Sequence, residues 1–364
     1  MNYYSLKNIL SRNAQYNVIF GERSNGKTYA CLKYALTESY KNGKQFAYVR
    51  RNKEDFVGKR GSALFDALIA NNEIKKITHG EWTGVYYYAS RWFLCKYDED
   101  GKRITAENPI ALGFALSDSE HDKSASFPHI TTIIFDEFIT RQYYLIDEFT
   151  IFANVVSTII RQRIDVKIFM LGNTVNKYSC PYFSEMGLTH VKEMKQGVID
   201  VYTYGETELR VAVEYCDSVS KAGKPNDYYF AFDNPKLSMI KSGSWEMAIY
   251  PHLPYKYKPK DILFMYFIKF DGVWLQCEII NNDEINATYT FIHPKTTSLT
   301  RQEEKYALIY SNDYCALPNW KRRINKPISN LMKRIYEYYT QERVYYATNE
   351  TGEIVRNYLQ WCSR

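Results

Sequence analysis

Several features that would place a protein in a familiar class are missing from this 364-residue sequence. Its seven cysteines form no CxxC pair and show no regular spacing, which argues against a zinc site or a disulfide framework and favours a reducing compartment. No run reaches the roughly 18 apolar residues that a membrane helix needs. The opening "MNYYSLKNILSRNAQ" has no apolar signal core. We therefore expect a soluble intracellular protein with no membrane partner.

The sequence also lacks a strong charge of either sign. Its 47 basic and 41 acidic residues leave a net charge of +6, which permits a polyanionic partner without requiring one. We find no internal repeats and no low-complexity tracts. The length suggests two or three domains, each able to bury its own core.

Apolar strand-like segments alternate with helix-like segments in the first half of the chain. This alternation predicts an α/β fold with a parallel sheet covered by helices on both faces. The expected strands are 16–20, 45–50, 130–138 and 165–173, and the expected helices are 27–40 and 147–161. The stretches "VYYYASRWFLCKY" and "NPIALGFAL" flank the turn-rich "DEDGKR", which predicts a hairpin insertion.

After about residue 204 the sequence becomes more polar and is interrupted by glycine and proline. We expect a first domain over 1–205, a partly helical linker over 206–245, and a smaller α+β domain over 246–364. The last of these contains two strands around a "DG" turn and a helix in "PISNLMKRIYEYYTQER". The helix is predicted to carry one apolar stripe, formed by Ile328, Leu331, Met332 and Ile335.

The stretch "GERSNGKT" carries the phosphate-binding pattern of a P-loop, between a predicted strand and a predicted helix. Gly21 and Gly26 allow the backbone to wrap an anion, Lys27 supplies charge for the β- and γ-phosphates, and Thr28 is placed for Mg²⁺. A chance match is the alternative, but the flanking strand and helix are the context that the motif requires. The predicted ATP contacts also include the intervening residues Glu22, Arg23, Ser24 and Asn25.

The strand "TTIIFDEF" ends in two adjacent carboxylates. Asp136 can hold magnesium, and Glu137 is placed to polarise a water for in-line attack on the γ-phosphate. Taken alone, such a pair is often a solvated strand end. A water-activating glutamate favours a motor over a small-molecule kinase or a switch protein. Asn173, at the end of the expected strand 165–173, is either a γ-phosphate sensor or an ordinary turn residue.

These stretches, with "QFAYVRRNKEDF", "IIRQR" and "IFMLGNTVNKYSCPYF", resemble the genome-packaging ATPases of small Salasvirus-type podoviruses. That family lies in the packaging and translocase branch of P-loop (ASCE-type) ATPases, and the resemblance covers residues 15 to about 185. It implies a homomeric ring, expected to be a pentamer, that pumps double-stranded DNA into a procapsid through the portal. A packaging RNA is a further candidate partner. The expected location is the host cytoplasm, transiently at the portal vertex and not in the mature virion.

The resemblance also implies residue roles. Arg161 matches the family's trans-acting arginine, with Arg163 as the alternative, and Lys53 matches a basic position near the neighbour's nucleotide. Lys123 matches a pore-loop lysine that contacts DNA. Arg50 and Arg51, beside Lys53, are interpreted as plain surface charge if they have no such role.

Larger packaging motors carry a C-terminal RNase H-like nuclease, so the resemblance implies a vestigial domain of this kind here. No spacing suggests a metal triad among its early acidic residues, and nuclease activity is not expected. Those acidic residues are Glu246, Asp261, Asp271 and Glu278. Seven basic residues between 320 and 345 form either a solvated face or a nucleic-acid or portal contact. Two rival functions remain: another DNA translocase or helicase, and a structural module whose ATP site only stabilises a ring.

Overall fold

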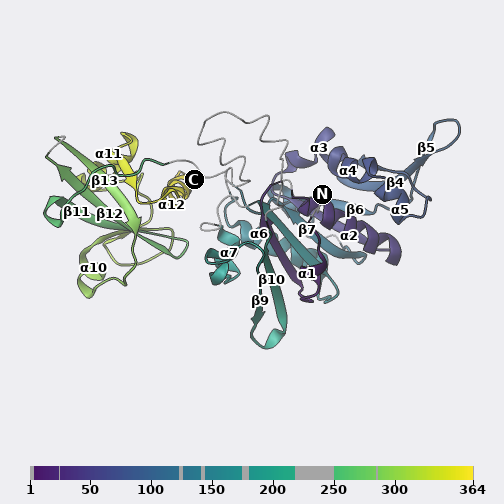
Figure 1. Ribbon diagram of the computed structural model, residues 1–364, viewed down its shortest axis with the longest axis horizontal. Coiled ribbons are helices and arrows are strands. Elements are labelled where there is room, and N and C mark those ends of the chain that lie inside the picture. The colour runs from purple at the N-terminus through teal and green to yellow at the C-terminus, as the bar shows by residue number, and fades with distance from the viewer. Residues whose placement is uncertain are drawn as a thin grey trace. The chain divides into compact units, whose positions relative to one another are not determined.

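The computed structural model describes residues 4–23, 25–122, 126–140, 144–173, 180–217, 250–283 and 286–363. These residues form two compact units, shown in Figure 1. The first holds the described residues up to 173 together with 188–217, and the second holds 180–187 and 250–363. Among the described helices, none has both the length and the apolar character needed to cross a membrane.

The first unit is built on a mixed sheet with a parallel centre. Its strand order is β3-β4-β6-β2-β7-β8-β1-β10-β9, with β5 paired to β4. The central strands are apolar and largely buried, as strands covered on both faces must be. They are β1 (Tyr16–Gly21), β2 (Gln45–Arg50), β7 (Ile130–Asp136), β8 (Lys167–Asn173) and β10 (Leu209–Tyr215). The predicted parallel α/β sheet is therefore confirmed.

Two sequence expectations differ from the structure at the edges of this sheet. The segment 209–215 was expected in a partly helical linker, but it forms β10, which pairs in parallel with β1. Most of the remaining expected linker lies outside the described residues. The hairpin around "DEDGKR" joins β4 to β5, whereas "ALGFA" forms β6, which runs parallel to β2 in the main sheet. The peripheral strands are β3 (Gly84–Tyr88), β4 (Arg91–Tyr97), β5 (Arg103–Thr105), β6 (Ala111–Ala115) and β9 (Ile199–Tyr204).

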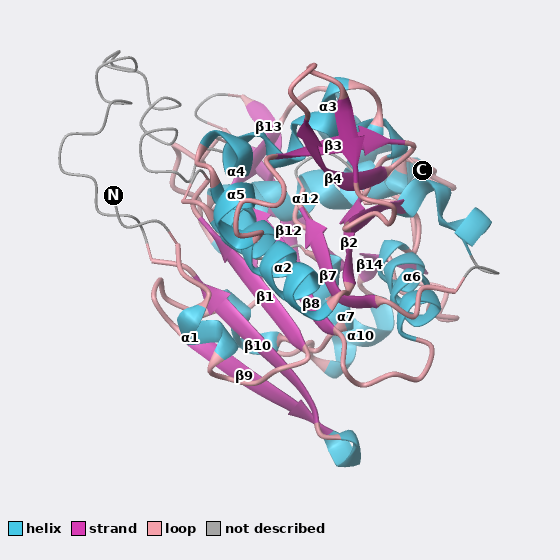
Figure 2. Cartoon of the chain, turned by 90° about the vertical axis from the view of Figure 1, so that its right-hand side faces the viewer, coloured by secondary structure: helices cyan, strands magenta, loops and turns pink. Residues whose placement is uncertain are grey.

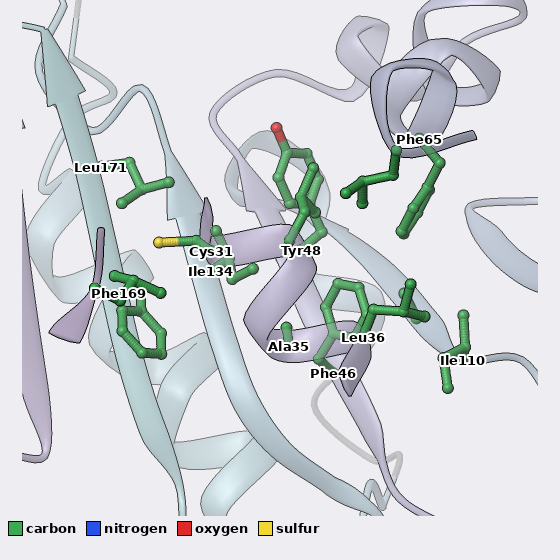
Figure 3. Packing of buried hydrophobic residues seen from close by; sticks show 14 of the residues in the cluster. Cys31, Ala35, Leu36, Phe46, Tyr48, Phe65, Ile110, Ile134, Phe169 and Leu171 are labelled. Atoms are coloured by element: carbon green, nitrogen blue, oxygen red, sulfur yellow. The ribbon is translucent and has the colours of Figure 1, made fainter. Parts of the chain in front are cut away.

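Helices cover both faces of the sheet. In Figure 2, α2 (Lys27–Asn42) lies across β7 and β8. It buries Cys31, Ala35 and Leu36 in the cluster shown in Figure 3, which also holds Ile134 of β7. The next residue of β7, Phe135, points to the opposite face and stacks on Phe152 of α6 (Glu148–Ile160), with 4.9 Å between ring centroids.

The other helices of this unit are short. The α-helices are α1 (Lys7–Leu10), α3 (Lys59–Ser62), α4 (Asp66–Ala70) and α5 (Glu73–Ile77). The 3-10 helices are η1 (Lys53–Phe56), η2 (Ala63–Phe65), η3 (Leu116–Asp122), η4 (Thr189–Lys192) and η5 (Gly205–Thr207).

The second unit has its own sheet, in the order β15-β14-β11-β12-β13-β16. The first two long strands form the predicted hairpin around "DG". The strands are β11 (Ile262–Phe270), β12 (Val273–Asn282), β13 (Ala287–Pro294), β14 (Leu308–Ser311), β15 (Trp320–Lys321) and β16 (Val344–Tyr346). The helices are α7 (Pro181–Glu185), η6 (Pro259–Asp261), α10 (Arg301–Tyr306), α11 (Asn330–Thr340) and α12 (Asn349–Cys362).

The expected apolar stripe of α11 is only half right. Met332 and Ile335 are buried in the core of the second unit. Ile328 is 74% exposed and Leu331 43% exposed. The helix begins at Asn330, because the Ser329 side chain caps it by accepting from the Met332 N–H, so Ile328 lies before the first turn.

Candidate nucleotide site

The phosphate loop joins the end of β1 to the start of α2. Gly26 adopts φ 94° and ψ 13°, a left-handed conformation that glycine tolerates best. Gly21 serves a different purpose from the one expected, because its φ is not positive. A Cβ at Gly21 would lie 2.8 Å from the Cβ of Cys216, so close packing against this residue, which directly follows β10, requires the glycine. Ser24 lies outside the described residues.

Lys27 is folded into this loop and is buried. Its Nζ donates to the carbonyl oxygens of Gly21 at 3.2 Å and Glu22 at 2.7 Å, and to Asn25 Oδ1 at 3.2 Å. Burial lowers the pKa of the Lys27 ammonium, against the opposing effect of nearby acidic groups that include Asp136. All of these acceptors belong to the loop, so the loop itself sets the position of the charge.

Asp136, at the end of β7, is oriented through both of its carboxylate oxygens. Oδ2 accepts hydrogen bonds from Thr28 Oγ1 at 3.0 Å and from Tyr48 Oη at 2.9 Å. Oδ1 accepts from the Glu137 backbone N–H at 3.0 Å. A hydroxyl and a carboxylate in contact are oxygen ligands of the kind that Mg²⁺ prefers, so Thr28 and Asp136 fit a magnesium site.

Glu137 has an unusual backbone and a paired side chain. Its φ of 59° lies in the left-handed region, which is uncommon for a non-glycine residue. Its Oε2 lies 2.7 Å from Arg50 Nη2, and Arg50 also contacts Asp55 at 3.2 Å. The Glu137 carboxylate therefore lies at the surface of the site, next to Asp136, and is held by an arginine of β2.

Arg51 holds the backbone that follows β7. It donates to the carbonyl oxygens of Glu137 at 3.2 Å and Phe138 at 2.9 Å, and to both carboxylate oxygens of the buried Glu148 at 2.7 and 2.8 Å. The interpretation of Arg50 and Arg51 as plain surface charge is therefore wrong. Arg50 contacts the Glu137 carboxylate, and Arg51 contacts the Glu137 carbonyl oxygen.

The remaining predicted residues lie at different distances from this centre. Asn173 ends β8 and is paired in register with Gly21, so it lies beside the start of the loop. Lys53 is 65% exposed and pairs with Asp118 at 2.6 Å. Glu22 and Arg23 are within the loop, and Lys123 lies outside the described residues.

The two candidate arginines after α6 differ in what surrounds them. Arg161 ends the helix in a left-handed conformation and is exposed. Arg163 is engaged within its own chain, where it also lies 3.6 Å from Asp165. Its guanidinium donates to the carbonyl oxygens of Phe127, Pro128, Ile130 and Ile159. These bonds join the end of α6 to the start of β7, so Arg163 has a structural role within its own chain.

Sequence reasoning missed Tyr48 entirely and misjudged Arg50 and Arg51. The signal was present in "QFAYVRR", because residues two apart on a strand share a face. The sequence does not indicate that β2 lies beside β7. This pairing places Tyr48 and Arg50 next to Asp136 and Glu137.

The second unit gathers basic and aromatic side chains near its edge strand β15. The guanidinium carbons of Arg322 and Arg323 lie 5.2 and 5.7 Å from the ring centroid of Trp361. Lys269 Nζ lies 5.8 Å from the ring centroid of Trp274 and 6.0 Å from that of Trp320.

The early acidic residues of this unit each have local partners. Asp261 accepts from the Lys258 N–H, Asp271 accepts from Asn312, and Glu278 accepts from Tyr257. Glu246 lies outside the described residues.

Comparisons with known proteins agree on one family. Residues 1–223 match the family described as Podovirus DNA encapsidation protein (Gp16). The DNA packaging protein of Bacillus phage phi29 is 28% identical over 184 residues, which cover 50% of this chain and 49% of that protein. The DNA packaging protein of Bacillus phage B103 is 30% identical over 187 residues, 50% of each chain. The chain thus spans about half the length of the curated relatives it matches.

Two solved structures share the fold over the whole chain. A structure of the bacteriophage Phi-29 viral genome packaging motor assembly aligns with a TM-score of 0.59 at 20% identity, covering 100% of this chain and 99% of that one. The Phi-28 gp11 DNA packaging motor aligns with a TM-score of 0.55 at 19% identity, covering 100% and 98%. The resemblance seen in the sequence motifs is therefore confirmed, and the fold likeness extends into the second unit.

Proposed function

Because the chain belongs to the Podovirus DNA encapsidation protein (Gp16) family, we propose that it is an ATP-driven motor that translocates double-stranded DNA into a preformed procapsid. One observation carries the proposal: the phosphate loop, the Thr28–Asp136 pair and the adjacent Glu137 meet in a single site. Binding a nucleotide needs only the first two elements. The carboxylate placed next to the metal-binding aspartate adds the capacity for hydrolysis.

In the proposed reaction, the loop N–H groups and Lys27 bind the β- and γ-phosphates of ATP. Lys27 exchanges its loop acceptors for phosphate oxygens, and Thr28 and Asp136 would hold Mg²⁺. Bound magnesium neutralises phosphate charge. Glu137 polarises the attacking water, and Asn173 senses the γ-phosphate from the end of β8. Because a Glu137 carboxylate oxygen contacts Arg50, turnover requires Glu137 to exchange Arg50 for the water.

The site is completed by a second copy of the chain. The exposed position of Arg161 at the end of α6 suits an arginine that reaches a neighbour's γ-phosphate, where it would stabilise transition-state charge. Lys53, exposed near the end of β2, is the second candidate for this contact. These roles fit a ring, proposed to be a pentamer, that docks on the portal of the procapsid in the host cytoplasm. A packaging RNA is a further proposed partner.

DNA contacts are expected to be made to phosphates, because a translocating motor must ignore sequence. The basic and aromatic cluster of the second unit, around Trp361 and Arg322, is one candidate surface. Lys123 is the candidate in the first unit.

The test is ATP hydrolysis by the full chain, with and without double-stranded DNA and purified procapsids. We expect hydrolysis that DNA and procapsids stimulate. Lys27→Ala should abolish ATP binding, whereas Glu137→Gln should bind ATP and fail to hydrolyse it, because Lys27 contacts ground-state charge and Glu137 acts in the transition state. Absence of turnover in the unmodified chain under all conditions would favour a structural module. Strand separation without packaging would favour a helicase.

A further inference from the structure

Tyr48 is a buried tyrosine to which the proposed mechanism assigns no role. It lies on β2 two residues before Arg50, so the two side chains share one face of the strand. Each contacts one of the adjacent carboxylates of β7: Tyr48 Oη donates to Asp136 at 2.9 Å, and Arg50 contacts Glu137 at 2.7 Å. The strand β2 thus holds both carboxylates of the site.

The ring of Tyr48 is fixed by its surroundings. It packs edge-on against Phe56 and Trp92, with interplanar angles of 89° and 85°, and only 6% of the residue is exposed. Figure 3 shows the phenol oxygen pointing away from the apolar residues of the cluster. A ring held in this way presents its hydroxyl at one place, which reduces the entropy lost when the hydrogen bond to Asp136 forms.

Thr28 donates to the same Asp136 oxygen, but the two hydroxyls differ in whether they can also bind the metal. Thr28 sits at the start of α2, directly after the phosphate-loop lysine, and is itself a proposed magnesium ligand. Tyr48 lies on β2, and its ring packs in a hydrophobic cluster. Of the two hydroxyls that donate to Oδ2, Tyr48 is therefore the one that can hold the carboxylate without also binding the metal.

We propose that Tyr48 is a positioning residue, which fixes the Asp136 carboxylate for magnesium through the hydrogen bond from its hydroxyl. This inference rests on the proposed nucleotide site. Groups that hydrogen-bond to metal ligands orient them, and their loss typically costs about 10- to 100-fold in metal affinity. Tyr48 should therefore affect the metal requirement of nucleotide binding and leave metal-free binding unchanged.

The experiment measures binding of a fluorescent ATP analogue to the full chain, first in EDTA and then across a Mg²⁺ titration. Tyr48→Phe should bind the analogue normally in EDTA, and its Mg²⁺ midpoint should rise about 10-fold or more. An unchanged midpoint would overturn the inference. If the unmodified chain binds no analogue at all, the proposed nucleotide site fails, and that result is distinct from failure of the Tyr48 role.

A matched control is available in the same aromatic cluster. The Tyr87 hydroxyl donates to the carbonyl oxygen of Phe56, and its ring centroid lies 5.1 Å from that of Trp92. Tyr87→Phe removes the same atom from the same cluster without touching Asp136, so its Mg²⁺ midpoint should not move. An equal rise in both variants would assign the effect to the cluster and overturn the role of Tyr48.

Two further variants separate positioning from folding. Adding Tyr48→Phe to Asp136→Asn should not raise the Mg²⁺ midpoint further, because the hydroxyl acts through the carboxylate. An additive rise would refute that route. If Tyr48→Phe lowers the thermal stability, 4-fluorophenylalanine at position 48 fills the space of the hydroxyl without donating, and the same rise is expected.

Discussion

Replacing Arg51 by alanine should destabilise the first unit strongly, although the residue follows another arginine in a run that resembles surface charge. The Arg51 guanidinium makes two bonds to Glu148 and one each to the carbonyl oxygens of Glu137 and Phe138. Its side chain is 9% exposed and that of Glu148 is 1% exposed. The substitution removes both guanidinium bonds from a buried carboxylate, which keeps the hydrogen bond from the Leu145 N–H at 2.7 Å.

The expected cost follows from that burial. Removing one partner of a buried ion pair typically destabilises by about 3–5 kcal/mol, because the other charge stays desolvated. The Leu145 N–H offsets part of this cost, whereas the two carbonyl oxygens that lose a donor add to it. For a unit of this size, each kcal/mol lowers the Tm by about 2–4 °C. We therefore expect Arg51→Ala to lower the Tm by roughly 10 °C.

Lys53→Ala is the matched control for this measurement. It removes a basic residue only two positions away, but the Lys53–Asp118 pair is exposed, with side-chain exposures of 65% and 34%. Exposed pairs contribute little to stability, so its Tm should stay close to that of the unmodified chain. Both variants are compared by scanning calorimetry of the full chain in the same buffer. Equal, small shifts would show that Arg51 is the surface charge that its sequence suggests.

Three further outcomes are expected. In rings mixed from Arg161→Ala and Glu137→Gln subunits, ATPase activity should peak at intermediate ratios, since some interfaces then pair an intact glutamate with an intact arginine; a flat profile with verified exchange would contradict this. Affinity for DNA should fall steeply with salt and be indifferent to sequence in competition assays. Burial raises the pKa of Glu214 and the hydrogen bond from Tyr4 opposes the rise, so Tyr4→Phe should destabilise the protein more at pH 7.5 than at pH 4; equal losses in urea unfolding would refute this.

A carboxyl group whose folded pKa lies above its unfolded pKa contributes its full stability below the unfolded value and loses it as the pH rises through the folded value. Glu214 is such a group. Tyr4→Phe removes a donor that favours the ionised form, so it widens the gap between the two pKa values and increases the loss on the alkaline side.

Local motifs predicted several of the residues that the structure brings together in the candidate nucleotide site. The phosphate loop and the Asp136–Glu137 pair are contiguous in sequence, and each is tied to the end of an apolar strand, so pattern and chemistry coincide. The central strands were predictable for the same reason. They are apolar throughout, and burial on both faces demands this of a parallel sheet.

Segments whose charged residues form hydrogen bonds with residues distant in the sequence could not be predicted. The segment "ELRVAVEY" looks polar, yet Leu209–Tyr215 is a strand of the main sheet, and its Glu214 is buried. The partner of Glu214 is Tyr4, 210 residues earlier in the chain, at 2.5 Å. No local pattern indicates a hydrogen bond over such a separation, so the burial of this carboxylate could not be predicted.

The same limit applies to β2. Its register on β7 determines which of its side chains reach the candidate site. Tyr48 and Arg50 reach Asp136 and Glu137 only because β2 pairs with β7 so that Val49 lies opposite Phe135. The pairing has an irregularity between Gln45 and Phe46, before the residues that contact the carboxylates. A shift of one residue would turn both side chains to the other face of the sheet. The irregularity at the start of β2 therefore belongs to the construction of the site, because it sets the register in which one strand holds both carboxylates of its neighbour.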